Sequence, residues 1–138
     1  MRKPLMVMVA AVMAIIGFAA PAQATATAVN MPFSMAYGNS TTSGTIHFTD
    51  GYSATVSGAV HAASGERNIC AYGVNGTLQS EFRCSDFAAA GGPNQPFSLP
   101  LSIPAAGGVQ RVDITMWDRP GTLLAREFCT RNGCTRLL

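Results

Sequence analysis

Apolar and polar residues alternate along most of the chain beyond residue 28. A period of two is typical of strands that bury one face and expose the other. Val29–Tyr37 has its larger apolar residues at odd positions, and the segment 54–62 has its apolar residues at even positions. No long segment beyond residue 28 has the spacing of an amphipathic helix. The pattern therefore predicts an all-β fold, an antiparallel β-sandwich of about seven to eight short strands.

Two dipeptides, Asp50-Gly51 and Asn75-Gly76, mark the tightest turns between these strands. Both are typical of hairpins, because glycine adopts the positive φ that two-residue turns require. The runs that flank the two turns are 44–49 with 52–62 and 69–74 with 77–84. Further strands are predicted at 97–103, 112–116 and 124–128, and the polar residues 39–43 are predicted to form a turn.

Prolines mark two of the predicted strands as edge strands, and one short segment departs from the alternation. Pro32 lies within the first strand, and Pro96, Pro100 and Pro104 lie in or beside the run 97–103. Because proline cannot donate to a sheet ladder, both segments are predicted to be edge strands. The segment 85–90 does not alternate. Ser85 as N-cap and Asp86 in the first turn predict a helix of one or two turns there.

The first 24 residues have the organisation of a cleavable secretory signal peptide. Arg2 and Lys3 precede an apolar run at 5–20, which Pro21 and the small residues at 22–24 follow. Cleavage is expected after residue 24, 26 or 28. The apolar run has 16 residues, whereas a membrane span needs about 20, so a signal is favoured over an anchor. The chain is thus predicted to be secreted, with an N-terminal edge strand and turn at 25–43 and the sandwich domain at 44–138.

Removal of the signal peptide changes the charge of the protein. The full chain has nine Lys and Arg residues and seven Asp and Glu residues, a formal charge of +2. Because Arg2 and Lys3 leave with the signal, the mature chain has seven of each and is formally neutral. Nucleic acids and anionic membranes are bound through basic surfaces, so neither is expected as a partner. The exclusive use of arginine after the signal, with abundant alanine and glycine, indicates a bacterial source.

The mature chain contains four cysteines, Cys70, Cys84, Cys129 and Cys134. An even number in an exported protein predicts a disulfide framework. Of the three possible pairings we favour Cys70–Cys84 with Cys129–Cys134, because the 69–84 hairpin brings the first pair nearly opposite each other. A zinc site is the alternative, but the chain has no C-x-x-C spacing and the predicted compartment is oxidising. We expect two disulfides, no metal and no cofactor.

No constellation of residues predicts a catalytic site. His47 and His61 occupy the polar face of the first hairpin, where the register separates them by about six residues, or ~20 Å. No serine lies in a G-x-S-x-G turn. Two acids close to the last hairpin are expected to pair with arginines on a solvated face, namely Asp113 and Glu127 with Arg111 or Arg126. We therefore expect no enzymatic activity.

Three residues are candidates for a binding site. Trp117 ends a predicted strand, where its ring can be presented to a ligand or can fill the end of the core. Tyr72 is out of phase with its apolar neighbours and is predicted to be exposed. Arg131 lies between Cys129 and Cys134, where a closed loop would present it rigidly to a partner or would only fasten the chain end.

The segment around the first cysteine pair resembles a known inhibitor family. Cys70, together with Cys84-Ser85-Asp86-Phe87 and the small residues at 88–92, is similar to the first disulfide and short helix of the Streptomyces subtilisin-inhibitor family. The resemblance implies a serine-protease inhibitor with an exposed loop, here at Arg131 or at Gln95–Pro104. The chain departs from that family in two ways: its second pair of cysteines lies only five residues apart, and it lacks the family's Cys-Pro motif.

The function expected from these residues is non-catalytic binding outside the cell or in the cell envelope. The partner is an unidentified protein or carbohydrate, and the oligomeric state is unspecified. A secreted serine-protease inhibitor is the first alternative, and a small secreted hydrolase is the second.

Overall fold

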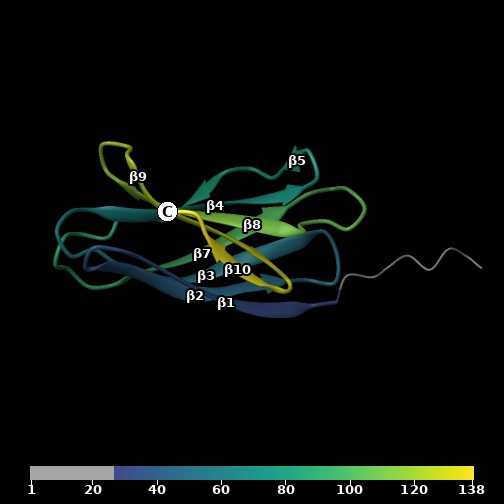
Figure 1. The fold of residues 1–138 in the computed structure, drawn as a ribbon, viewed down its shortest axis with the longest axis horizontal. Helices are drawn as coiled ribbons and strands as arrows, with labels where there is room; N and C mark the ends of the chain where they lie inside the picture. The colour runs from purple at the N-terminus through teal and green to yellow at the C-terminus, as the bar shows by residue number, and fades with distance from the viewer. Residues whose placement is uncertain (1–26) are drawn as a thin grey trace, which may run out of the picture.

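The computed structural model describes residues 27–138, which form an all-β sandwich of antiparallel strands (Figure 1). The predicted signal peptide at 1–24 lies outside the described residues. The strands are β1 Val29–Tyr37, β2 Ser40–Phe48, β3 Ser53–His61, β4 Arg67–Asn75, β5 Leu78–Gln79, β6 Arg83–Cys84, β7 Gln95–Ser102, β8 Arg111–Asp118, β9 Leu123–Thr130 and β10 Gly133–Arg136. The predicted fold class is confirmed, with more strands than the alternation indicated; most of them are longer than predicted, and two, β5 and β6, have only two residues each.

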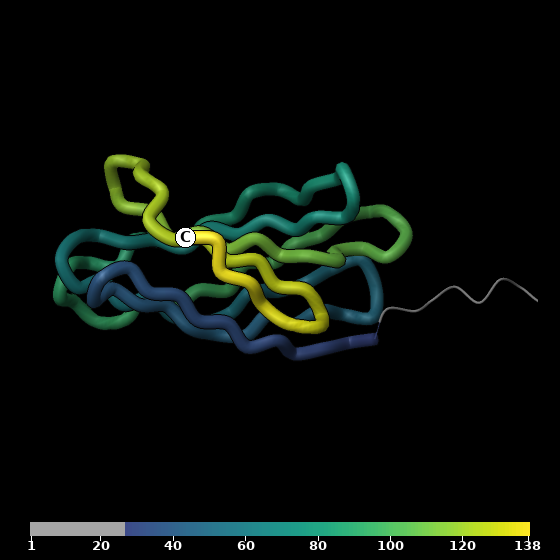
Figure 2. The backbone as a smooth tube through the Cα atoms, viewed as in Figure 1, coloured from purple at the N-terminus to yellow at the C-terminus, as the bar shows by residue number. Residues whose placement is uncertain are grey.

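The strands form two layers, which Figure 1 shows one above the other. The four-stranded sheet has the order β1-β2-β3-β7, and the six-stranded sheet has the order β10-β9-β8-β4-β5, with β6 also paired to β4. β1 and β7 lie at the two edges of the four-stranded sheet, where the prolines had placed them. Figure 2 shows the C-terminal hairpin β9–β10 crossing beside β1 at one side of the sandwich. There the Arg136 guanidinium donates a hydrogen bond to the Ala36 carbonyl.

The core lies between the sheets and follows from the alternation of apolar residues. Every second side chain of the long strands points inward, and these side chains are almost completely buried. The largest are Phe48, Ile46, Ile69, Ile103, Ile114 and Met116. Because this face is apolar on nearly every strand, its burial is the main source of stability for a domain of this size.

A glycine pair sets the distance between β2 and β3. Gly44 and Gly58 are register partners at the middle of these strands. A Cβ added to Gly44 would lie 2.0 Å from the Ser57 carbonyl oxygen and 2.7 Å from the Gly58 Cα. These are backbone atoms, so a side chain at Gly44 would separate the two strands.

Two local predictions, the helix at 85–90 and the turn at 39–43, are wrong because these residues form hydrogen bonds with distant segments instead. The described residues contain no helix, so the one predicted at 85–90, which the inhibitor resemblance also implies, is absent. Instead, the Ser85 amide donates to the Ile69 carbonyl at 2.7 Å, and Ala88 and Arg67 exchange backbone hydrogen bonds at 2.8 and 3.2 Å. A segment that donates to the edge of a sheet cannot also form the internal bonds of a helix.

The predicted turn at 39–43 is shorter than expected, since β2 begins at Ser40. Ser40 and Thr42 are buried polar residues with partners: the Ala63 amide donates to Ser40 Oγ at 3.0 Å, and Thr42 Oγ1 donates to the Ala59 carbonyl at 2.8 Å. The polar sequence here reflects hydrogen-bonded positions at the end of the sandwich. In the described part of the predicted segment 25–43, β1 and the start of β2 belong to the same sheet as β3.

Both predicted cysteine pairs form disulfides, Cys70–Cys84 and Cys129–Cys134. In each case the two residues are direct register partners on adjacent strands, β4 with β6 and β9 with β10. The bonded state favours an oxidising environment such as the outside of the cell. Among the described residues, no helix has the length and apolar character needed to cross a membrane.

Substitution of Gly44 by alanine is expected to lower the free energy of unfolding by about 3 kcal/mol, because the methyl group overpacks a rigid backbone contact. Gly51→Ala is the matched control, since a Cβ there meets nothing closer than Thr49 Oγ1 at 4.0 Å. Urea denaturation followed by far-UV circular dichroism measures both variants. Equal stability of the two variants would show that β2 and β3 can separate without cost.

Candidate functional site

The outer face of the six-stranded sheet carries the residues with binding chemistry. On β4 and β8, the residues that do not face the core alternate with those that do, so they point away from the four-stranded sheet. The register places Asn68 opposite Trp117 and Tyr72 opposite Asp113. Two of the sequence candidates, Tyr72 and Trp117, therefore lie on one face.

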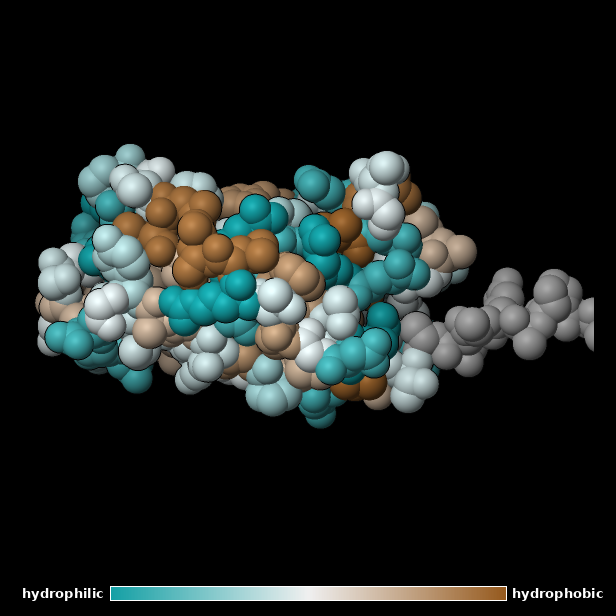
Figure 3. Space-filling view, in the orientation of Figure 1, coloured by the Kyte–Doolittle hydropathy of each residue, from teal (hydrophilic) through white to brown (hydrophobic). Residues whose placement is uncertain are grey.

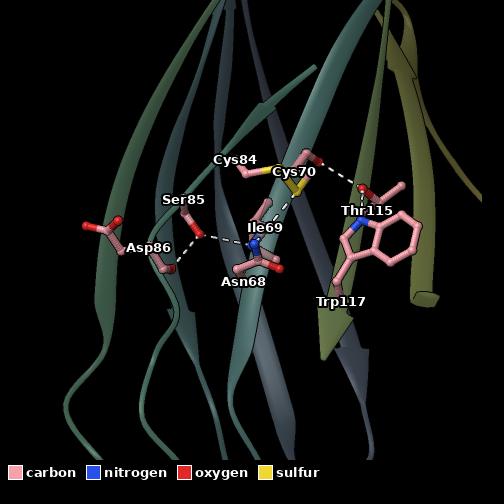
Figure 4. The surroundings of a disulfide bond; sticks show 8 residues. All are labelled: Asn68, Ile69, Cys70, Cys84, Ser85, Asp86, Thr115 and Trp117. Carbon is pink, nitrogen blue, oxygen red and sulfur yellow. Dashed lines mark hydrogen bonds between the residues drawn. A yellow bond between two sulfur atoms is a disulfide. The ribbon is translucent and has the colours of Figure 1, made fainter. Parts of the chain in front are cut away.

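Residues 78–90, here called the cover segment, run along the free edge of β4. The segment is held to β4 by the Cys70–Cys84 disulfide. At its start, the Ser80 amide donates to the Gly73 carbonyl at 2.9 Å, and the Gly73 amide donates to Ser80 Oγ at 2.7 Å. The Ser85 amide likewise donates to the Ile69 carbonyl at 2.7 Å. The Ile69 amide donates to Ser85 Oγ at 3.0 Å (Figure 4). The cover segment thereby brings Phe82 beside Tyr72, with 5.9 Å between the ring centroids.

The face between the cover segment and the end of β8 is hollowed into a shallow groove of about 250 Å³. Three of its lining residues are aromatic, and Phe82 is 53% exposed. The residues that line this aromatic groove are Asn68, Cys70, Phe82, Phe87, Trp117, Asp118, Arg119 and Gly121. Most of the lining is apolar, and the polar groups are few, which is typical of ligand sites.

Trp117 is oriented by a chain of hydrogen bonds (Figure 4). Its Nε1–H donates to Thr115 Oγ1 at 2.8 Å, and Thr115 in turn donates to the Cys70 carbonyl at 3.2 Å. The indole is half-buried and lies outside the cluster of core residues. Trp117 therefore does not fill the end of the core, and its ring has a fixed direction on the outer face.

Two polar groups flank these rings. The Arg119 guanidinium lies 4.4 Å from the centroid of Phe87 and pairs with Glu66, with Nη2 donating to Oε1 at 2.8 Å. The hydrogen bond from Arg119 lowers the pKa of Glu66. The pair is therefore charged at neutral pH, and it holds the cation over the Phe87 ring face.

Asn68 is the buried polar residue of the aromatic groove. Its Nδ2 lies 3.8 Å from Cys70 Sγ, and its Oδ1 is a buried atom with no hydrogen-bond partner within residues 27–138. An unpaired buried acceptor costs about 1–3 kcal/mol relative to a paired one. Figure 4 shows the Asn68 side chain on the same side of the sheet as the Trp117 indole.

Beneath Tyr72 lies a buried acid that the sequence placed on a solvated face. Asp113 is fully buried, and its carboxylate accepts from Arg111 Nε at 3.0 Å and from Arg126 Nη2 at 2.9 Å. Arg126 Nη2 also donates to the Tyr72 hydroxyl at 3.2 Å. The hydrogen bond that Arg126 donates to Asp113 raises the pKa of Arg126. The expected partners are correct, but two arginines and Tyr72 cover the acid, so Tyr72 is half-buried.

Glu127 does not join this cluster, contrary to the expectation that it pairs with Arg111 or Arg126. It faces the other side of β9, is only 5% exposed, and lies with Oε1 3.6 Å from Cys129 Sγ. Burial raises the pKa of Glu127, and the charge of Arg136 opposes this only in part. The alternation of β9 places Glu127 and Arg126 on opposite faces, which the linear pairing argument overlooked.

Arg131 is not presented to solvent as a binding residue would be. Its guanidinium turns inward and donates to the Thr49 carbonyl at 2.9 Å and the Val109 carbonyl at 3.2 Å, and it lies 4.9 Å from the centroid of Phe48. Burial lowers the pKa of Arg131. Arg131 therefore links the end of β9 to loops at the end of the core. This structural role differs from the binding role that the sequence suggested.

The two histidines lie apart, as the register predicted. His47 is opposite Thr55 and contacts Asn30 Oδ1, whereas His61 contacts Asn94 Oδ1 at 3.1 Å. Within residues 27–138, neither ring has a carboxylate among its hydrogen-bond partners. The arrangement gives neither histidine the acid partner of a catalytic pair.

Two other surfaces are less suited to recognition. A larger cleft of about 500 Å³ opens between β7 and the cover segment, but its two charged residues, Glu81 and Arg83, pair with each other at 2.8 Å. Figure 3 shows apolar surface near the C-terminus, where Leu137 and Leu138 are 47% and 59% exposed. Neither surface combines fixed aromatic rings with a buried polar atom.

Sequence reasoning did not find Phe82, Phe87 or Asn68. The sequence features that could have located these residues were the predicted Cys70–Cys84 disulfide and the out-of-phase Tyr72. A disulfide at Cys84 brings the residues on either side of Cys84 near the outer face of β4. The sequence interpretation treated 77–84 as a plain strand, whereas only its ends pair with β4.

The raised pKa of Glu127 predicts a stability that falls with pH. A carboxyl with a folded pKa above its unfolded value of 4.5 binds the proton more tightly in the folded state, so the free energy of unfolding decreases as pH rises through the folded pKa. Glu127→Gln is expected to remove this decrease and to be more stable than the wild type at about pH 8 but not at about pH 4. Thermal melts across this range test it, with Glu81→Gln as control for an exposed carboxyl. Parallel wild-type and Glu127→Gln profiles would contradict the expectation.

In comparisons with protein-family models, curated proteins and solved structures, nothing matches this chain.

Proposed function

We propose that the protein is an exported, non-catalytic binding domain and that the aromatic groove is its ligand site. The signal-peptide pattern at 1–24 and the two disulfides support export. The observation that carries the site is that Trp117, Phe82 and Phe87 line one groove together with Asn68.

The groove is rigid in the way that a binding surface needs. Its base is the paired strands β4 and β8, and its opposite wall is the cover segment, which is held to β4 by a disulfide and backbone hydrogen bonds. Trp117 is held by Thr115. A site whose side chains are already ordered loses less conformational entropy when it binds a ligand.

A carbohydrate is the ligand class that fits this groove best. A sugar ring has a flat face of C–H groups and a rim of hydroxyls, so it can stack on aromatic rings while its rim forms hydrogen bonds. The groove is shallow and supplies both, with Trp117 and Phe82 as rings and Asp118 and Arg119 as polar neighbours. Asn68 also lines the groove, with its amide beside Cys70 Sγ.

The alternatives have less support from the geometry. The two segments proposed as an inhibitory loop do not protrude, since Gln95–Ser102 is strand β7 and Arg131 turns inward. A hydrolase would need an acid and a base placed together in a cleft, whereas the aromatic groove is lined by a single carboxylate, Asp118, and by neither histidine.

Loss of an aromatic ring is expected to weaken polysaccharide binding. Trp117→Ala and Phe82→Ala should each reduce the affinity of the mature domain about 30-fold, the effect of losing ~2 kcal/mol at a binding hot spot. Depletion of the protein by insoluble cellulose, chitin, xylan and peptidoglycan identifies the ligand, and titration calorimetry with its soluble fragments measures the affinity.

Tyr52→Ala is the matched control, because Tyr52 is 58% exposed but lies outside the aromatic groove. It should bind as the wild type does. Retention on no polysaccharide, or an equal loss in Tyr52→Ala, would contradict the proposed function.

A further inference from the structure

The second disulfide joins a buried cysteine to an exposed one. Cys129 on β9 is completely buried, whereas its partner Cys134 on β10 is exposed. Thiol–disulfide exchange begins when a thiolate attacks one sulfur and the other leaves. Because Cys134 is the exposed residue of the pair, we take its sulfur as the one that an external thiolate attacks, and Cys129 is then the leaving group.

The leaving sulfur has a carboxyl beside it. Glu127 Oε1 lies 3.6 Å from Cys129 Sγ, and the carboxyl and both sulfurs lie within 4.8 Å of one another. A disulfide sulfur carries no hydrogen, so it can only accept in this contact. The contact is therefore a hydrogen bond when Glu127 is protonated and donates its O–H to the sulfur.

The surroundings of Glu127 favour the protonated form. Arg136 lies opposite it on β10, but the guanidinium of Arg136 donates to the carbonyls of Ala36 and Leu138. On β8 the opposite residue is Ile114, and the only titratable side chain of the neighbouring β1 is Tyr37, next to Ala36, whose carbonyl binds Arg136. Burial raises the pKa of the Glu127 carboxyl, which is how enzymes keep a carboxylic acid as a proton donor.

The first disulfide provides an internal comparison. Cys70 is buried and Cys84 is exposed, and both disulfides have a Cα–Cα distance of 4.0 Å. The polar side chain beside Cys70 Sγ is the Asn68 amide, at 3.8 Å. An amide does not transfer a proton in this pH range. The two bonds therefore share their burial pattern and differ in the presence of an acid.

We propose that Cys129–Cys134 is a thiol–disulfide exchange site in which Glu127 protonates the departing Cys129. The reductant is an external dithiol, whose first thiolate attacks Cys134 Sγ and forms a mixed disulfide while the Sγ–Sγ bond breaks. The electron pair of that bond goes to Cys129 Sγ, which takes the proton of Glu127 and becomes a thiol. The second thiolate of the dithiol then displaces Cys134, which takes a proton from water. The dithiol is oxidised to a disulfide, and two electrons have passed to the cysteine pair.

The experiment compares the two disulfides within one molecule. The mature protein is treated with limiting dithiothreitol, quenched, alkylated and digested, and mass spectrometry gives the rate of reduction of each bond. The thiolate fraction of dithiothreitol changes with pH, but it affects both rates equally, so their ratio does not depend on it. In the wild type at low pH, Cys129–Cys134 should be reduced faster than Cys70–Cys84. The ratio of the two rates should fall on the order of 100-fold from about pH 5 to about pH 9 as Glu127 ionises.

Glu127→Gln should give a low ratio that does not change with pH, whereas Glu81→Gln should behave as the wild type does. A wild-type ratio that is independent of pH would overturn the proposal, because exposure of Cys134 alone would then explain the rate. Equal rates for the two bonds at low pH would overturn it as well. If Glu127→Gln does not fold, the wild-type pH profile still decides. The proposal is independent of the aromatic groove, which none of these variants alters.

Discussion

The fold depends on strand β4, which is covered on both faces and hydrogen-bonded on both edges. Its inner side chains, such as Ile69 and Ala71, complete the core, and its outer side chains form the base of the aromatic groove. One edge pairs with β8 along its whole length, and the other is held by β5, β6 and the Cys70–Cys84 disulfide. A strand held in this way transmits the rigidity of the core directly to the outer surface.

The outer face also shows how a formally neutral domain arranges its charges. Asp113 is fully buried and has two arginine partners, so its charge is compensated where a single partner would leave a large desolvation cost. Arg111 and Arg126 are themselves held flat against this face, one over the Phe128 ring and one against the Tyr72 hydroxyl. The aromatic and charged residues therefore stabilise each other's positions, and Arg119 continues the same arrangement over Phe87.

The two disulfides have similar positions but different surroundings. Each links adjacent strands, with one cysteine buried and the other exposed. The first lies in the floor of the aromatic groove beside an amide, which suits a structural bond at a binding surface. The second lies at the C-terminal hairpin beside a buried carboxyl. The two disulfides thus support different proposals because their neighbouring side chains differ. Cys70–Cys84, beside Asn68, belongs to the proposed binding site, and Cys129–Cys134, beside Glu127, is the proposed redox site.

The sequence by itself determined the long strands, the edge positions of β1 and β7, and the cysteine pairs. These follow from local rules: alternation shows which side chains are buried, proline excludes a ladder hydrogen bond, and the glycine of Asn75-Gly76 turns the chain between the register partners Asn75 and Leu78. Only the tertiary structure decided that residues 85–90 pair with β4, that Arg131 turns inward, and that Phe82, Phe87 and Asn68 meet Trp117. Each of these depends on contacts between segments distant in sequence, where a free strand edge or an open carbonyl outweighs the local preference of a short segment.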